Sequence, residues 1–215
     1  MNRNNSGVVT ARRRPGPLDS LTERFVPQGR ARQTTVPRAG RSGALGRIRG
    51  VNAFDDVLAA NTDYQKTFVD PGLPGRAAKG LAVVTCMDSR IDPLGMLGLS
   101  PGDAKILRTA GARVTDDVLR SLVLAHYLLG VDRVMVLAHT DCGMAKARDE
   151  DVHAAVQQQA GIDSRSLDFR TISDQEATLR HDVQRVRSSP YLPKGMPVVG
   201  GVYDVRSGAV TVTVP

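Results

Sequence analysis

Two short stretches of the chain carry residues that could do chemistry. The first is Cys-Met-Asp-Ser-Arg at 86–90, and the second is His-Thr-Asp-Cys at 139–142. Two thiolates and an imidazole, supplied by Cys86, His139 and Cys142, form a donor set that zinc uses in proteins, and three protein ligands leave a fourth position open for a reaction. The residue types therefore predict a catalytic zinc site.

The elements before these stretches must bring the donors together. Each stretch directly follows a mainly apolar run in which about half of the residues are β-branched, Leu81–Thr85 before the first and Val134–Ala138 before the second. Runs this short, with Gly80 and Gly130 close by, are typical of buried parallel strands rather than of core helices. Sites in doubly wound sheets lie beyond the carboxyl ends of the strands. We therefore expect the donors to meet at one edge of a sheet.

Asp88 and Arg90 extend the chemistry of the first stretch. A spacing of i, i+2 and i+4 in an extended segment places Cys86, Asp88 and Arg90 on one side. Two thiolates cancel the charge of zinc, so a bound water is acidified less than at a site with three histidines. A nearby carboxylate could accept or orient a proton, and an arginine could hold that carboxylate bidentately. We expect a catalytic pair, with a purely structural ion pair as the alternative.

Together the two motifs resemble those of a known family. C-x-D-x-R followed by H-x-x-C, each behind a predicted strand, is similar to the pattern of the β-class carbonic anhydrases, and the similarity extends from about Val51 to the C-terminus. The resemblance implies a zinc enzyme that hydrates CO₂ reversibly to bicarbonate and a proton, by attack of zinc-bound hydroxide. It also implies a homodimer or homotetramer in which the helix at 51–69 packs across a neighbouring subunit.

The resemblance gives a role to five residues. It implies that Cys86, His139 and Cys142 bind Zn²⁺ and that Asp88 and Arg90 form a catalytic dyad. Because the family occurs in an open and a closed form, Asp88 could also be a fourth zinc ligand in the closed state. We hypothesise that Asp88 ligates zinc at low pH and pairs with Arg90 at high pH, so that activity rises through mildly alkaline pH.

Other interpretations of these residues stay open. Relatives with the same ligands hydrolyse carbonyl sulfide or carbon disulfide, and a zinc-binding regulatory or scaffold protein with weak turnover would also keep the motifs. A Cys86–Cys142 disulfide is a structural alternative, although it leaves His139 unexplained. We expect Asp141 to be solvated or to cap a turn rather than to ligate. Three further histidines are interpreted as surface or core residues rather than proton shuttles: His126, His153 and His181.

The remaining pattern predicts an α/β fold, with a mostly parallel central sheet flanked by helices and an antiparallel edge strand. Helices are predicted at 51–69, from 92 to about 97, and at 115–129, 149–160 and 174–188. Strands are predicted at 81–85, 104–108 and 132–138, followed by an edge pair at 198–205 and 209–214. The broad apolar surface of the helix at 115–129 predicts burial on two sides, against the sheet and a partner subunit.

The formal charge of +7 is unevenly distributed along the 215 residues. Residues 1–50 contain 11 arginines and two acidic residues, whereas the remainder carries slightly more acidic than basic side chains. Because residues 1–50 show no periodic pattern of apolar residues, they are predicted to be a disordered tail. A single zinc domain is predicted to follow at 51–215. The tail could be a targeting peptide or contact polyanions non-specifically, but nucleic acid is not an expected partner of the folded domain.

The sequence also predicts where the protein works. No stretch approaches the roughly 18 apolar residues that span a bilayer. The N-terminus lacks the apolar segment of a secretory signal. We therefore expect a cytoplasmic protein with CO₂ or bicarbonate as its small-molecule substrate and no membrane partner.

Overall fold

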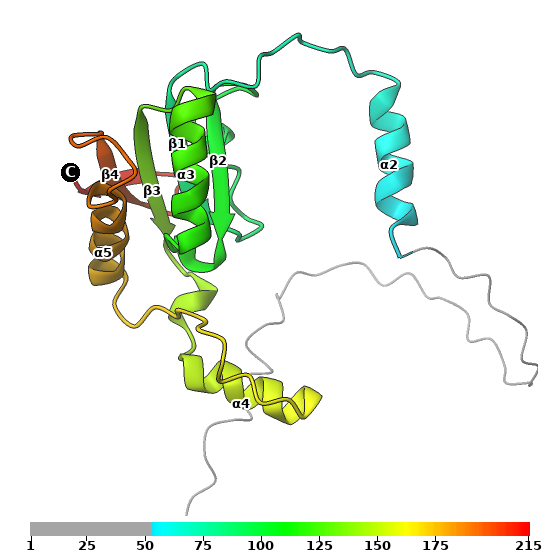
Figure 1. Ribbon diagram of the computed structural model, residues 1–215. Helices are drawn as coiled ribbons and strands as arrows, with labels where there is room; N and C mark the ends of the chain where they lie inside the picture. The colour runs from blue at the N-terminus through cyan, green and yellow to red at the C-terminus, as the bar shows by residue number, and fades with distance from the viewer. Residues whose placement is uncertain (1–52) are drawn as a thin grey trace, which may run out of the picture. The chain divides into compact units, whose positions relative to one another are not determined.

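The computed structural model describes residues 53–215, so the predicted tail at 1–50 and the first two residues of the predicted helix at 51–69 lie outside the described residues. The chain divides into two units, one ending at Asp63 and one running from Tyr64 to Pro215, and each is described by itself (Figure 1). Across the described range, no helix has the length and apolar character needed to cross a bilayer.

Helix α2 (Asp55–Gln65) corresponds to the first predicted helix. Two aspartates in its first turn, Asp55 and Asp56, interact favourably with the positive end of the helix dipole. It ends earlier than predicted because the chain tightens after Gln65, where the amides of Thr67 and Phe68 both donate to the Tyr64 carbonyl. None of its residues is buried.

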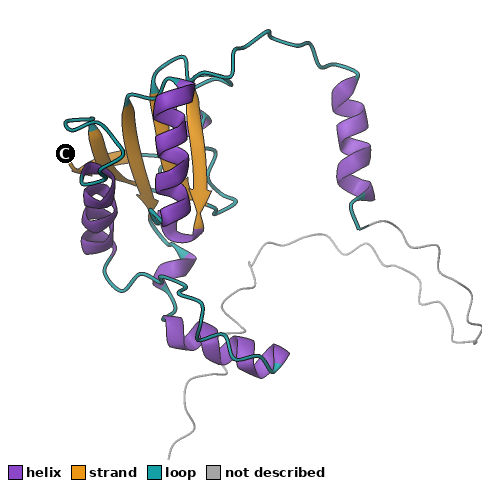
Figure 2. Ribbon diagram, in the orientation of Figure 1, coloured by secondary structure: helices purple, strands orange, loops and turns teal. Residues whose placement is uncertain are grey.

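The central sheet has five strands in the order β2-β1-β3-β4-β5 (Figures 1 and 2). Its strands are β1 (Leu81–Cys86), β2 (Ala104–Thr109), β3 (Arg133–His139), β4 (Val198–Tyr203) and β5 (Val210–Val214). Strands β1 to β4 run parallel to one another, and β5 pairs antiparallel with β4 at the edge. The predicted fold class, a mostly parallel sheet with an antiparallel edge strand, is confirmed.

The predicted helices are also present. The α-helices are α3 (Asp116–Leu129), α4 (Asp149–Ala160) and α5 (Gln175–Arg187), and the 3₁₀ turns are η2 (Gly95–Leu97), η3 (Ala110–Ala112) and η4 (Gly143–Ala145). Thr115 caps α3 as predicted, because its hydroxyl accepts the Val118 amide at 3.4 Å. The short helix expected from residue 92 is a single 3₁₀ turn, preceded by Asp92, whose carboxylate accepts the Gly95 amide.

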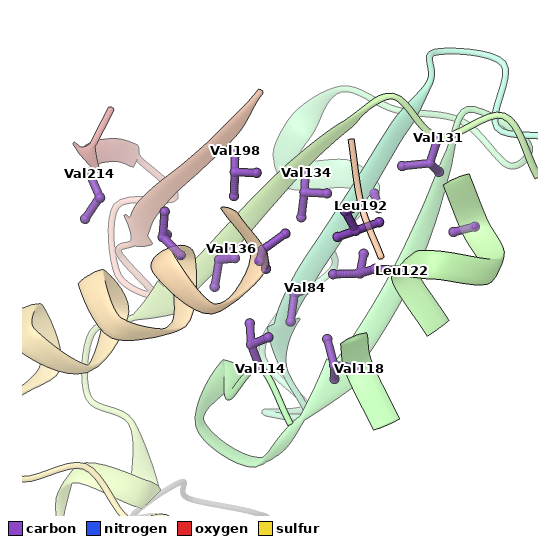
Figure 3. Packing of buried hydrophobic residues seen from close by; sticks show 14 of the residues in the cluster. Val84, Val114, Val118, Leu122, Val131, Val134, Val136, Leu192, Val198 and Val214 are labelled. Carbon is purple, nitrogen blue, oxygen red and sulfur yellow. The ribbon is translucent and has the colours of Figure 1, made fainter. Parts of the chain in front are cut away.

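The main core lies between one face of the sheet and helices α3 and α5 (Figure 3). Alternate residues of β1 and β3, including Val84, Val134 and Val136, point to this face and pack with Leu122 of α3 and Val183 of α5. The prediction that α3 is buried against the sheet is confirmed. Burial of its other side against a partner stays a prediction.

Strand register brings the two motifs to the same edge of the sheet. Strands β1 and β3 are adjacent and parallel, with Thr85 opposite Leu137. The buried Thr85 hydroxyl donates to the Leu137 carbonyl at 3.0 Å and ties the strands together just before both motifs. Cys86 and His139 therefore end neighbouring strands at the carboxyl edge, where a parallel sheet builds its sites.

Candidate metal centre

The three predicted donors come together in the structure. The ligand atoms of Cys86, His139 and Cys142 all lie within 4.8 Å of one another. The three residues are only 4%, 1% and 4% exposed, respectively. Both cysteines are free thiols, so the disulfide alternative is wrong for this structure. The role of the group as metal ligands stays a prediction.

Hydrogen bonds orient the imidazole of His139. Its Nδ1 lies 2.9 Å from the Thr140 carbonyl oxygen, which can only accept, so Nδ1 carries the proton and Nε2 keeps its lone pair. The His139 carbonyl oxygen accepts the Gln175 side-chain amide at 2.7 Å, which links the end of β3 to the start of α5. Nothing in the local sequence pattern had pointed to Gln175.

The donor group fits a metal ion. Among the described residues, His139 Nε2 is buried and has no hydrogen-bond partner, although it lies beside two thiol sulfurs. A buried nitrogen with an unused lone pair is costly unless something pairs with it. Two sulfurs and one imidazole nitrogen form a soft set that suits zinc. Apolar neighbours surround the cysteines and limit their contact with water: Ile91, Met96, Ala112, Met144 and Tyr203.

The two thiols behave as a coupled pair. The hydrogen bond with Cys142 lowers the pKa of Cys86 to about 3. The same hydrogen bond, together with burial, raises the pKa of Cys142, and this outweighs the hydrogen bonds from the Met144 and Ala145 amides at η4. The segment that follows Cys142 is a single 3₁₀ turn, η4, so its stabilisation of a thiolate is small. A divalent cation would stabilise both sulfurs as thiolates.

Burial acts to lower the pKa of His139, but the neighbouring sulfur of Cys86 and its charge outweigh burial, so the net shift of the pKa is upward. A metal ligand must be neutral imidazole. Binding of a cation would therefore compete with a proton at this ring, and the affinity for the metal should fall in acid.

Strand β2 holds the backbone of the first motif in place. The Arg108 guanidinium donates to the carbonyl oxygens of Cys86 and Asp88 at 3.0 and 2.5 Å. The Met87 amide donates to the Thr109 carbonyl, and the Gly111 amide bonds the Cys86 sulfur. The segment after β1 is thus fixed by a neighbouring strand rather than by its own secondary structure.

Asp88 and Arg90 form a bidentate ion pair, called the fork below, beside the three donors. Arg90 Nε lies 3.0 Å from Asp88 Oδ1 and Nη2 lies 2.7 Å from Oδ2, while the Arg90 amide donates to Oδ1 at 2.9 Å. Hydrogen bonding by Arg90 holds the pKa of Asp88 far below its usual range. Asp88 Oδ2 is 3.9 Å from His139 Nε2, so the ionised carboxylate faces the donor group.

The comparisons with known proteins agree with this site. A family model described as carbonic anhydrase matches residues 81–210. Beta-carbonic anhydrase 1 of Mycobacterium tuberculosis is 38% identical over 161 residues, which span 75% of this chain and 98% of the relative. The chain belongs to the β-carbonic anhydrase family.

Other relatives extend the picture of this β-carbonic anhydrase. The crystal structure of carbonic anhydrase from Streptococcus mutans is 37% identical with a TM-score of 0.72, and the match covers 76% of this chain and 98% of that one. A carbon disulfide hydrolase of Acidianus sp. is 31% identical over 178 residues, or 72% of this chain and 85% of the relative. The resemblance inferred from the two motifs is therefore confirmed at the level of the family.

Asp141 has more partners than the sequence suggested. Instead of being simply solvated, its carboxylate accepts from Arg90 at 2.9 Å and from Lys146 at 2.6 Å. These two cations lower the pKa of Asp141 to about 2, with Lys146 the larger cause. A charged residue between His139 and Cys142 was the only available signal of this role.

The remaining histidines lie outside the donor group of this carbonic anhydrase. His126 is bonded to the Val131 carbonyl and His153 to the Ser164 hydroxyl, at 2.7 and 2.9 Å. His181 is exposed on α5. Their interpretation as surface or core residues agrees with these positions.

Proposed function

We propose that this chain catalyses the reversible hydration of CO₂ to bicarbonate and a proton. The observation that carries the proposal is the buried Cys86–His139–Cys142 group with the Asp88–Arg90 pair beside it. Membership of the β-carbonic anhydrase family supports the same reaction.

Zinc is the proposed metal, held by Cys86 Sγ, Cys142 Sγ and His139 Nε2. When bound, zinc supplies a Lewis acid that lowers the pKa of water and so provides a nucleophile near neutral pH. The tautomer fixed by Thr140 leaves His139 Nε2 free to ligate. The apolar side chains around the cysteines would keep bulk water from competing for the donors.

Asp88 and Arg90 would orient the proton of the attacking water. With its pKa held low, Asp88 is an acceptor throughout the physiological range, and its Oδ2 faces the donor group. It would accept a hydrogen bond from the attacking water and orient it toward CO₂. Arg90 would keep the carboxylate in that position through its two hydrogen bonds to the two carboxylate oxygens. A closed state in which Asp88 is a fourth ligand stays a prediction.

We also propose that the chain works as a homodimer or homotetramer. Apolar side chains on the outer side of α3 are well exposed, namely Leu124, Tyr127 and Leu128. A hollow of about 600 Å³ beside them has five apolar lining residues, from α3 and the segment after α5, and five polar or charged ones; the apolar residues are Leu119, Val123, Leu124, Pro190 and Tyr191. Exposed apolar patches of this kind mark interfaces. Separately, α2 leaves Val57 and Leu58 more than half exposed, which suits packing on a second copy.

A reducing compartment such as the cytoplasm would suit this site. Cys86 and Cys142 are both free thiols, and a disulfide between them would remove two of the three donors.

Carbon disulfide or carbonyl sulfide hydrolysis is the second candidate function. It is favoured by the similarity to carbon disulfide hydrolases, such as the Acidianus protein at 31% identity. The carbonic anhydrase relatives named above are more similar, at 37 and 38% identity, so CO₂ is the preferred substrate.

One experiment separates these functions. Zinc-loaded full-length protein is assayed for CO₂ hydration by stopped flow and for sulfide release from carbonyl sulfide and carbon disulfide. We expect CO₂ hydration with about one zinc per chain and little sulfide release. Rapid sulfide release without CO₂ hydration would favour the hydrolase, and full zinc content without either activity would favour a scaffold. Sedimentation of the same sample should give the mass of two or four chains.

A further inference from the structure

Arg90 is held from two sides, and only one side belongs to the dyad. Besides its contacts with Asp88, its Nη1 donates to Asp141 Oδ2 at 2.9 Å, and its Nη2 donates to the Asp141 carbonyl oxygen at 3.1 Å. All three guanidinium nitrogens are therefore engaged. The Arg90 side chain is 45% exposed. A long side chain at such a position would otherwise sample many rotamers.

The backbone at Asp141 is shaped for this contact. Asp141 has a φ of 57°, in the left-handed region that aspartate and asparagine adopt more readily than most residues other than glycine. That turn presents both its carboxylate and its carbonyl oxygen to Arg90. Its second carboxylate oxygen lies 2.6 Å from Lys146 Nζ. The result is a row of four alternating charges: Asp88, Arg90, Asp141 and Lys146.

The two carboxylates do not compete for the same hydrogens of Arg90. Arg90 donates to Asp88 from Nε and from Nη2. It donates to the Asp141 carboxylate from Nη1 and to the Asp141 carbonyl oxygen from Nη2. An arginine fixed by one carboxylate is already in place for the other, so the entropy of ordering it is lost only once.

We propose that Asp141, backed by Lys146, is a positioning residue that keeps Arg90 beside Asp88 and thereby keeps the Asp88 carboxylate away from the metal. The inference deepens the proposed function and rests on its metal site. In the structure Asp88 pairs with Arg90. In the predicted closed state Asp88 would ligate the metal instead, and an interaction that orders Arg90 would favour the pair with Arg90 over that state.

The chain contains a matched control for this arrangement. Asp163 and Arg165 repeat the Asp-x-Arg spacing, with the arginine amide and guanidinium both bonded to the carboxylate. Within residues 53–215, Arg165 bonds no second carboxylate. A variant at Asp163 therefore removes an Asp-x-Arg pair without touching the row of charges.

The test uses the full chain loaded with Co²⁺ in place of zinc, titrated with azide at fixed pH and followed by visible absorption. Azide needs the position that Asp88 would otherwise take. Asp141→Asn keeps the side-chain size and tolerates the left-handed backbone. We expect about five- to tenfold weaker azide affinity with unchanged cobalt content, and about two- to threefold weaker affinity for Lys146→Met. Asp163→Asn should match the wild type.

A double-mutant cycle shows whether Asp141 acts through Asp88. In an Asp88→Asn background, Asp141→Asn should change azide affinity by less than about twofold. Unchanged or tighter azide binding by Asp141→Asn alone, or equal weakening in both backgrounds, would overturn the proposal. Failure of the wild type to bind cobalt would overturn it together with the metal site. A wild type that binds azide normally but does not hydrate CO₂ would overturn only the proposed function.

Discussion

Within residues 53–215, an arginine two positions after an aspartate bonds both oxygens of that carboxylate in two places, and only one of them lies at the candidate site. At Asp88–Arg90 and at Asp163–Arg165 the arginine amide donates to the aspartate Oδ1, at 2.9 and 3.0 Å. In both pairs the guanidinium also bonds both carboxylate oxygens. The amide contact recurs at Asp168–Arg170 and Asp204–Arg206, but the Arg170 guanidinium bonds only one oxygen of Asp168. The spacing therefore favours the amide contact and does not by itself fix the fork.

The surroundings of the two pairs differ. Asp88 is 17% exposed and faces the buried donors, whereas Asp163 is 54% exposed and Arg165 is 81% exposed. Arg90 also meets a second carboxylate, which Arg165 lacks among the described residues. Exposed ion pairs contribute little because water screens them. The comparison teaches that an Asp-x-Arg pair gains a chemical role from what it faces, and not from its own geometry.

The largest expected effect comes from removing one of the three buried donors that Asp88 faces. Cys142→Ala should lose nearly all bound zinc and much of the stability of the fold, because the buried trio loses one of three ligands. Zinc content by elemental analysis and thermal unfolding check this outcome.

Val136→Ala serves as the control for lost stability. Val136 is buried in the main core, so its truncation should cost about 2 kcal/mol while zinc content stays at the wild-type level. A Cys142→Ala protein that keeps its zinc would show that the trio is not the metal site.

A direct comparison of the two arginines gives the next largest effect. Arg90→Ala should reduce the kcat for CO₂ hydration about 10²-fold with zinc retained, because Asp88 loses the group that holds it. Arg165→Ala should leave kcat, zinc content and Tm unchanged. Stopped-flow kinetics measure kcat, and elemental analysis measures zinc content, on the same preparations of both variants. Equal kinetics for the two variants would mean that Asp88–Arg90 is only a structural ion pair.

The smallest of the three effects is expected at Gln175, which supports the other motif. Gln175→Met keeps the length of the side chain but removes the donor to the His139 carbonyl. Zinc affinity, measured by competition with a chelator, should fall by up to about tenfold. Unchanged affinity would show that β3 alone positions His139.

Much of the fold follows from local patterns in the sequence. The runs at 81–85 and 134–138 are short and mainly apolar, and both form buried parallel strands. Thr115 and Gly130 mark the ends of α3, where a hydroxyl caps the first turn and a left-handed residue ends the last. The helix predicted at 51–69 is shorter in the structure, because its final residues leave the regular pattern before the Asp70-Pro71 break.

The site could be predicted only in part. Donor types and their position behind two strands pointed to Cys86, His139 and Cys142, and the parallel register brings them within reach of one another. Gln175 and Arg108 were missed, because each bonds a backbone carbonyl from another element and neither has a motif of its own. Asp141 was expected to be solvated or to cap a turn, and its contact with Arg90 was missed because Arg90 is 51 positions away in the chain.

By itself, the sequence determined the chain order of strands and helices, the donor set and the spacing of Asp88 and Arg90. These are local properties, fixed by side-chain type, periodicity and spacings of a few residues. Only the tertiary structure decided which of the Asp-x-Arg pairs faces the thiols, and that Asp141 meets Arg90. Such contacts depend on strand register and on the path of loops after the strands, which no short pattern specifies.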